Sequence, residues 1–145
     1  MEQLNLLGAV TALWIYLFSM LVFIARLVNK PKLERLAGIL LFVSAFPLGY
    51  MLATAGSYHR SMLYSVQVSL MLIWIAVAFL LDYVFKLEFR QNLRWVIAYV
   101  TLFFAGTGGM LGVASLAGKG WMLSAVVLFL MMAALTFYQR AKTGK

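Results

Sequence analysis

Five long stretches of this chain contain no Asp, Glu, Lys, Arg or His, and this feature limits the fold more than any other. They are residues 3–25, 36–58, 61–81, 95–118 and 120–139. Each has about the 20 residues that a helix needs to cross a hydrocarbon core about 30 Å thick. Because lipid offers no hydrogen bonds, each stretch must satisfy its own backbone polar groups as a helix. The sequence therefore predicts an all-α, polytopic integral membrane protein with five transmembrane helices.

The connections between these stretches are too short to hold a soluble domain. We expect one helical-bundle domain over residues 1–145, with spans at about 4–28, 35–57, 61–86, 93–117 and 120–139. Only 11% of the residues are charged, against about 25% in a soluble domain. The first stretch has no basic leading segment and no small-residue cleavage site, so we expect it to be a retained helix.

The basic residues are distributed unevenly between the two ends of the predicted spans. Of the 12 Lys and Arg residues, only Arg60 and Lys119 lie on the opposite side from the others. Basic connections stay on the cytoplasmic side, so we expect the N-terminus outside and the C-terminus in the cytoplasm, in a bacterial-type inner membrane. The net charge of +8 is spread over three short segments, which favours contact with anionic lipid over nucleic acid.

Missing residue types exclude several chemistries. The chain has no cysteine and a single histidine, His59. Disulfides, thiolate catalysis, iron–sulfur clusters and His-rich metal sites are therefore excluded within one chain. With only four acidic residues, no intramembrane carboxylate pair is available. We expect no catalytic residues, no bound metal and no cofactor.

A shift of 60 residues aligns two parts of the chain and pairs Gly49 with Gly109. This internal similarity predicts one helix followed by two tandem helical hairpins. The alignment also brings Pro47 to the level of Gly106, and helix interruptions at matching positions of two repeats indicate a transporter binding site. Pro47 and Gly106 are therefore candidate ligand-binding or pore-lining residues. The alternative is that both are ordinary in membrane helices, where neighbouring groups repair the backbone.

The fourth span contains four glycines in seven residues, 106–112. On a helical wheel most of its small residues form one face that suits close helix packing. The candidate packing residues are Ala105, Gly108, Gly109 and Gly112, together with Gly49 of the second span. Gly106 lies on another side of the wheel, so packing on this face does not explain it, and a helix break at this residue is the alternative to packing.

The third span carries one stripe at helical spacing. Its members are Arg60, Tyr64, Gln67, Met71, Trp74, Ala78 and Asp82. An unpaired amide in lipid costs several kcal/mol, so the stripe is expected to face into the bundle. Arg60, Tyr64, Gln67 and Trp74 are candidates for lining a ligand site or a pore. The alternative is an interhelical hydrogen bond from Gln67 that stabilises the bundle.

Asp82 is the acidic residue that the sequence places within a predicted span. Lys86 lies four residues further on, and Arg26 of the first span reaches the same depth. These three residues form either a structural ion pair or a proton or cation site.

Three functions remain open. The first is a small transporter or channel-like protein that binds a small neutral, amphipathic or anionic ligand within the bundle. The second is a noncatalytic partner or assembly subunit of a larger membrane complex. The third is a lipid-modifying membrane enzyme. The expected partners are membrane lipids, further copies of the chain or another membrane protein, and a small-molecule ligand.

The orientation can be tested with a reporter fused to the C-terminus. We expect a fluorescent protein fused there to be bright in the cytoplasm, and alkaline phosphatase fused there to be inactive. Alkaline phosphatase activity at the C-terminus would show the opposite orientation.

Overall fold

The computed structural model describes residues 2–57, 62–81 and 93–143, and this part of the chain is all-helical. The helices are α1 (Glu2–Leu27), α2 (Pro31–Val43), α3 (Ala45–Thr54), α4 (Met62–Phe79), α5 (Leu93–Ser115) and α6 (Lys119–Thr143). Since α2 and α3 together form one span, five segments are long and apolar enough to cross a membrane. The all-α class and the five apolar spans are confirmed.

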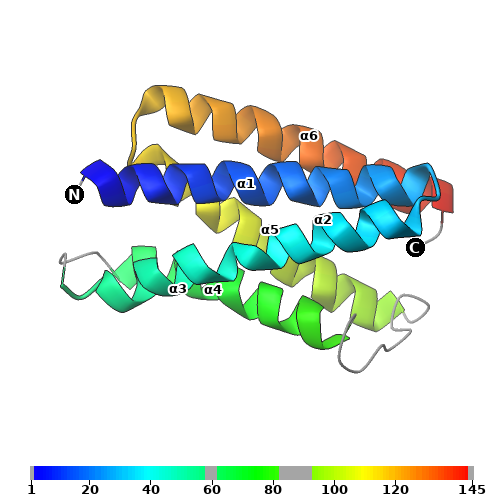
Figure 1. Ribbon diagram of the computed structural model, residues 1–145, viewed down its shortest axis with the longest axis horizontal. Helices are drawn as coiled ribbons and strands as arrows, with labels where there is room; N and C mark the ends of the chain where they lie inside the picture. The colour runs from blue at the N-terminus through cyan, green and yellow to red at the C-terminus, as the bar shows by residue number, and fades with distance from the viewer. Residues whose placement is uncertain (1, 58–61, 82–92, 144–145) are drawn as a thin grey trace.

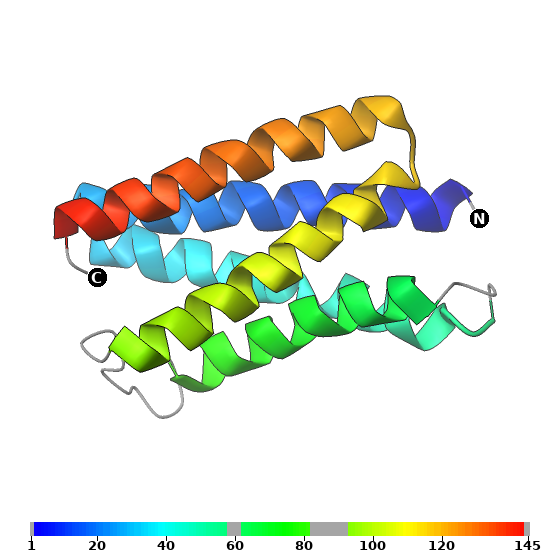
Figure 2. The ribbon, with the colours of Figure 1, turned by 180° about the vertical axis from the view of Figure 1, so that it is seen from behind.

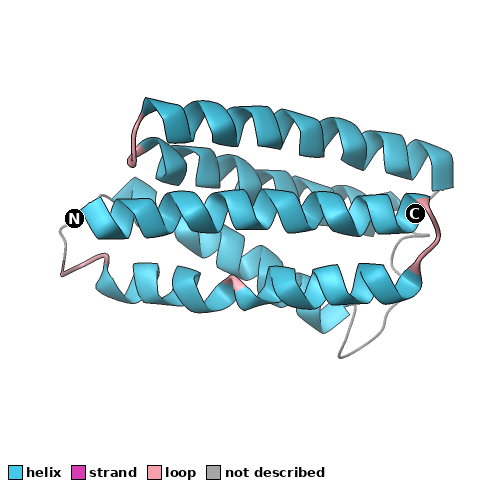
Figure 3. Cartoon of the chain, turned by 45° about the horizontal axis from the view of Figure 1, so that its top comes forward, coloured by secondary structure: helices cyan, strands magenta, loops and turns pink. Residues whose placement is uncertain are grey.

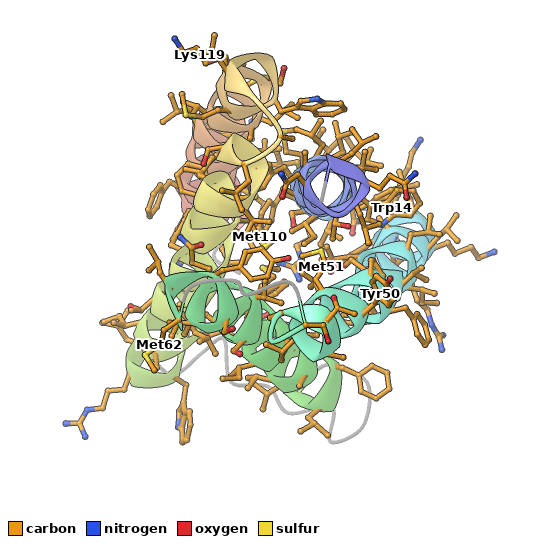
Figure 4. The ribbon with its side chains drawn as sticks, turned by 90° about the vertical axis from the view of Figure 1, so that its left-hand side faces the viewer. Trp14, Tyr50, Met51, Met62, Met110 and Lys119 are labelled. Carbon is orange, nitrogen blue, oxygen red and sulfur yellow. The ribbon has the colours of Figure 1, made fainter. Side chains whose placement is uncertain are left out.

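The helices run back and forth along one long axis (Figure 1). The α1–α2 connection and the C-terminus lie at one end, and the start of α1 and the α5–α6 connection lie at the other, as the reverse view also shows (Figure 2). We call the first the basic end, because it holds Arg26, Lys30, Arg35, Arg94 and Arg140. Helix α1 has the most neighbours, since it packs against α2, α3, α5 and α6. In the view along the bundle, Met51 and Met110 point inward, whereas Met62 and Lys119 point outward (Figure 4).

Local sequence explains where α1 ends and α2 begins. Asn29 adopts a positive φ of 55°, a conformation that asparagine tolerates better than most residues. This lets the Lys30 amide donate to the Ala25 carbonyl at 2.9 Å, which is the bond that closes a helix in a Schellman motif. Pro31 then occupies the first position of α2, where its missing N–H costs nothing. The chain therefore reverses direction within three residues.

The second span is interrupted at Ser44, as Figure 3 shows. Pro47 has no N–H to donate to the carbonyl of Val43, and its ring clashes with that carbonyl in a regular helix. The Ser44 amide instead donates to Leu41, three residues back, at 3.1 Å. This leaves the carbonyl of Leu40 to accept a hydrogen bond from Trp14 Nε1 of α1 at 2.8 Å. The predicted weakening of this span near Pro47 is therefore confirmed, and α1 compensates for it.

The fourth span has no such interruption, because α5 continues from Leu93 to Ser115 through all its glycines. Of the two alternatives for Gly106, the helix is therefore unbroken and the glycine serves packing. Gly106 is buried against the backbone of α4, and a Cβ on it would lie 3.1 Å from the Cα of Met71. The missing side chain is what allows α4 and α5 to approach so closely.

The face of α5 that packs against α4 also differs from the predicted face. Gly109 and Gly112 do lie against a neighbour, since a Cβ on either would contact Gln67 of α4. A Cβ on Gly108 or Gly49 would meet nothing within 4 Å, and Ala105 is exposed. Helix α4 lies against the side of α5 that carries Gly106, Gly109 and Gly112. The face predicted from the helical wheel included Gly108 and Ala105 and left Gly106 out.

Two neighbouring glycines provide a matched test of this packing. We expect Gly106→Ala to lower the stability of the bundle by about 1 kcal/mol, because overpacking costs about 1–3 kcal/mol and the alanine regains about 1 kcal/mol of helix propensity. Thermal unfolding of the purified protein in detergent measures the change. Gly108→Ala is the control and should unfold at the same temperature as the parent or a higher one. Equal effects of the two substitutions would contradict a close approach at Gly106.

Candidate ligand cavity

A cavity of about 500 Å³ lies between the helices in the half of the bundle nearest the basic end. Every helix except α3 contributes to it. It is lined by Ser19, Val22, Phe23 and Arg26 of α1; Pro31, Glu34, Arg35, Gly38, Leu41 and Phe42 of α2; Trp74 and Ala78 of α4; Val96, Tyr99, Val100 and Phe103 of α5; and Thr136, Gln139 and Arg140 of α6. This volume falls in the range of roughly 300–1,000 Å³ that holds one small molecule.

The cavity exists because α2 and the α4–α5 pair diverge toward the basic end (Figures 1 and 2). Near the interruption at Ser44 the span still packs against α4, where the rings of Phe42 and Phe79 meet edge to face at 5.6 Å. Beyond that point α2 follows α1, while α4 and α5 stay together. The side chains between the two groups of helices then line an open space.

Charged side chains surround the outer part of the cavity. The lining contains three arginines and one glutamate. Arg26 Nε donates to Glu34 Oε1 at 2.7 Å, so one arginine is neutralised. Arg35 and Arg140 form no ion pair in the part of the chain that the structure describes. The described residues of the outer part therefore carry a net positive charge.

Aromatic rings form its inner wall. Trp74 packs on Phe103 with ring centroids 4.8 Å apart and on Tyr99 at 6.0 Å. Phe23 meets Phe103 edge to face at 6.0 Å. Because α1 rises 1.5 Å per residue, Arg26 and Ser19 are separated by about 10 Å along the axis. The lining thus changes from charged to apolar over about 10 Å.

Two polar atoms of the inner wall have no hydrogen-bond partner among the described residues. They are Ser19 Oγ and Trp74 Nε1, in side chains that are 2% and 5% exposed. Each atom itself has less than 1 Å² of accessible surface, so a ligand atom reaches it only after a small shift of the side chains around it. Leaving a buried donor unpaired costs about 1–3 kcal/mol, and this cost favours such a shift when a polar ligand atom is present.

The opposite half of the bundle is closed. Tyr16 donates to the Thr107 carbonyl at 2.6 Å, and a Cβ on Gly8 would lie 2.7 Å from a methyl group of Val113. Gln67 lies against Gly109 and Gly112. These contacts join α1, α4 and α5 directly, so the cavity ends near the middle of the bundle.

The structure places the predicted lining residues in different surroundings. Trp74 lines the cavity, whereas Gln67 and Tyr64 lie in the closed half. Gly106 and Pro47 are not among the lining residues either, because Gly106 packs on α4 and Pro47 lies in the first turn of α3. The stripe of the third span does face inward, since Tyr64, Met71, Trp74 and Ala78 are all buried.

The predicted site of Asp82, Lys86 and Arg26 stays a prediction, because Asp82 and Lys86 lie outside the described residues, as does Arg60. Arg26 itself pairs with Glu34 across the α1–α2 connection.

Several lining residues escaped the sequence analysis, among them Ser19, Arg35 and Arg140. Ser19 is one of three hydroxyl residues in the first apolar stretch, with Thr11 and Tyr16, so the sequence does not single it out. The sequence does not single out Arg35 or Arg140 either, because basic residues at the ends of spans are also found where they only set the orientation of a membrane protein.

Comparison of the chain with known protein families, curated proteins and solved structures finds no match. The cavity and its lining are therefore the features from which a function must be argued.

Proposed function

We propose that this chain is a small transporter-like membrane protein that binds a small amphipathic ligand between its helices. One observation carries the proposal: a cavity of about 500 Å³ that has arginines at its outer part, aromatic rings at its inner wall and two unpaired buried polar atoms. Ligand sites in proteins are largely apolar with a few well-placed polar groups. This lining has that composition.

The difference between the two halves of the bundle supports transport over simple binding. The cavity reaches one end, while the contacts at Gly8, Tyr16 and Gln67 close the other half. A transporter that alternates its access has one side open and the other closed at any moment. With α5 continuous through Gly106, the helix interruption that supports the proposal is the one at Ser44 in the second span.

We further propose that the cavity opens toward the cytoplasm of a bacterial-type inner membrane, with the N-terminus outside and two tandem hairpins after α1. The support is the charge distribution of the described residues. Lys30, Arg35, Arg94, Arg140 and Lys142 gather at the basic end, and Lys119 lies at the other. Such an asymmetry is the usual mark of the cytoplasmic side.

A partner or assembly subunit is the second candidate. The outward face of α5 at Gly108 supports it, because nothing lies within 4 Å of a Cβ built there and another helix could approach closely. Light scattering of Gly108→Leu against the parent would detect a lost homo-oligomer. We do not propose the lipid-modifying enzyme, because among the described lining residues the one carboxylate, Glu34, is paired with Arg26.

Cysteine labelling tests the transport proposal, and the natural absence of cysteine gives a clean background. Ser19→Cys and Thr11→Cys place thiols on α1 in the open and the closed half. With a membrane-impermeant maleimide we expect Ser19→Cys to react from the side of the basic end. We expect Thr11→Cys to react from the opposite side, because an alternating protein opens there too.

The control is Val10→Cys, whose side chain is 46% exposed on the outside of the bundle and should be shielded by lipid from either side. If Thr11→Cys never reacts while Ser19→Cys does, the protein binds its ligand without alternating access. If Ser19→Cys is also inert from both sides, the cavity is not open to water and the proposal fails.

A further inference from the structure

We infer that the ligand is a small organic acid with a short apolar body and a second polar group at its far end. This inference rests on the proposed function and names the chemical class that the cavity would take. It follows from the positive outer part, the apolar middle and the unpaired Ser19 Oγ and Trp74 Nε1 at the inner wall.

The acid end is indicated by the placement of Arg35 in particular. It lines the outer part of the cavity from α2, as Arg140 does from α6. Neither arginine forms an ion pair among the described residues, since the one glutamate of the lining is paired with Arg26. An anion in the outer part of the cavity would therefore have two guanidinium groups with which to form charge-assisted hydrogen bonds.

The short apolar body follows from the depth of the cavity. Arg26 and Ser19 are separated by about 10 Å along α1, whereas one leaflet of the hydrocarbon core is about 15 Å thick. A phospholipid tail that crosses a leaflet is therefore longer than the cavity is deep. A short chain or a single ring fits against Trp74, Tyr99 and Phe103.

The far polar group is indicated by what the two unpaired atoms can do. The indole N–H is only a donor, and a hydroxyl both donates and accepts. A hydroxyl or carbonyl on the ligand can satisfy either type of group once a small side-chain shift uncovers it. Ring contacts with Tyr99 and Phe103 hold the indole of Trp74 beside the cavity.

Three related compounds test the inference on the full-length protein in phosphatidylcholine nanodiscs. They are ω-hydroxyoctanoate, octanoate, which lacks the far hydroxyl, and octanediol, which lacks the acid. Equilibrium dialysis of the labelled compounds, corrected with empty nanodiscs, gives the affinities. We expect ω-hydroxyoctanoate to bind about tenfold more tightly than either analogue, because each lost hydrogen bond to a charged or buried group has about that effect.

Substitutions identify which group recognises which end. Arg35→Gln and Arg140→Gln should each weaken both acids about tenfold and leave octanediol unchanged. Lys119→Gln, at the other end of the bundle, is their control. Ser19→Ala and Trp74→Phe should remove the advantage of ω-hydroxyoctanoate over octanoate without altering octanoate itself.

The outcomes separate this inference from the proposed function. Ala78→Leu fills the cavity and should abolish all binding, whereas Ala76→Leu, on the exposed side of α4, should not. If Ala78→Leu abolishes binding but the acids and octanediol bind equally, the inference is wrong and the proposed function stands. If Ala78→Leu binds all three compounds as the parent does, the proposed function is also wrong.

The same acid chemistry could come from a lipid headgroup or from a soluble metabolite. Nanodiscs that contain phosphatidylglycerol distinguish the two sources. Loss of ω-hydroxyoctanoate binding in those nanodiscs identifies the headgroup as the occupant of the arginine site. Unchanged binding identifies a soluble acid.

Discussion

The close approach of α4 and α5 at Gly106 is the contact on which the rest of this bundle depends. No side chain separates the two backbones there, since a Cβ would lie 3.1 Å from the Cα of Met71. Membrane helices gain little from the hydrophobic effect against one another, so such close van der Waals contact is a main source of their association. With α4 and α5 joined, the interrupted second span follows α1 instead, and the cavity forms between the two groups.

The cavity is therefore a consequence of uneven packing along one axis. Where small residues face a neighbour, as at Gly8 and Gly112, the helices meet directly. Where Phe23, Trp74 and Phe103 replace them, the helices are held apart by ring contacts at 4.8 to 6.0 Å. Rings that pack edge to face leave space beside them, and here that space adjoins Arg35 and Arg140. Packing and electrostatics thus place an apolar pocket and a positive region in contact.

Much of this fold follows from the sequence alone, because uncharged stretches of the right length have one stable form in lipid. The weakness near Pro47 was equally predictable, since a missing N–H is a property of the residue. The role of Gly106 was not, because a glycine in a helix marks either a break or a close contact and only the neighbouring helix decides which. The Arg26–Glu34 pair shows the same limit. It forms because the tight turn at Asn29 brings the start of α2 back to the end of α1, and a helix-by-helix reading of the sequence does not include such a turn.

The break at Ser44 has a mechanical consequence. A continuous helix bends as a stiff rod, because every bend must strain several hydrogen bonds in series. Here one bond is absent by covalent structure and the next has moved to Leu41, so bending at this level strains little. The indole of Trp14 is bonded to the carbonyl of Leu40 just before the break, and the Arg26–Glu34 pair ties the other end of α2 to α1. The first helix therefore supplies the support that the second span lacks in its own backbone hydrogen bonds at this level.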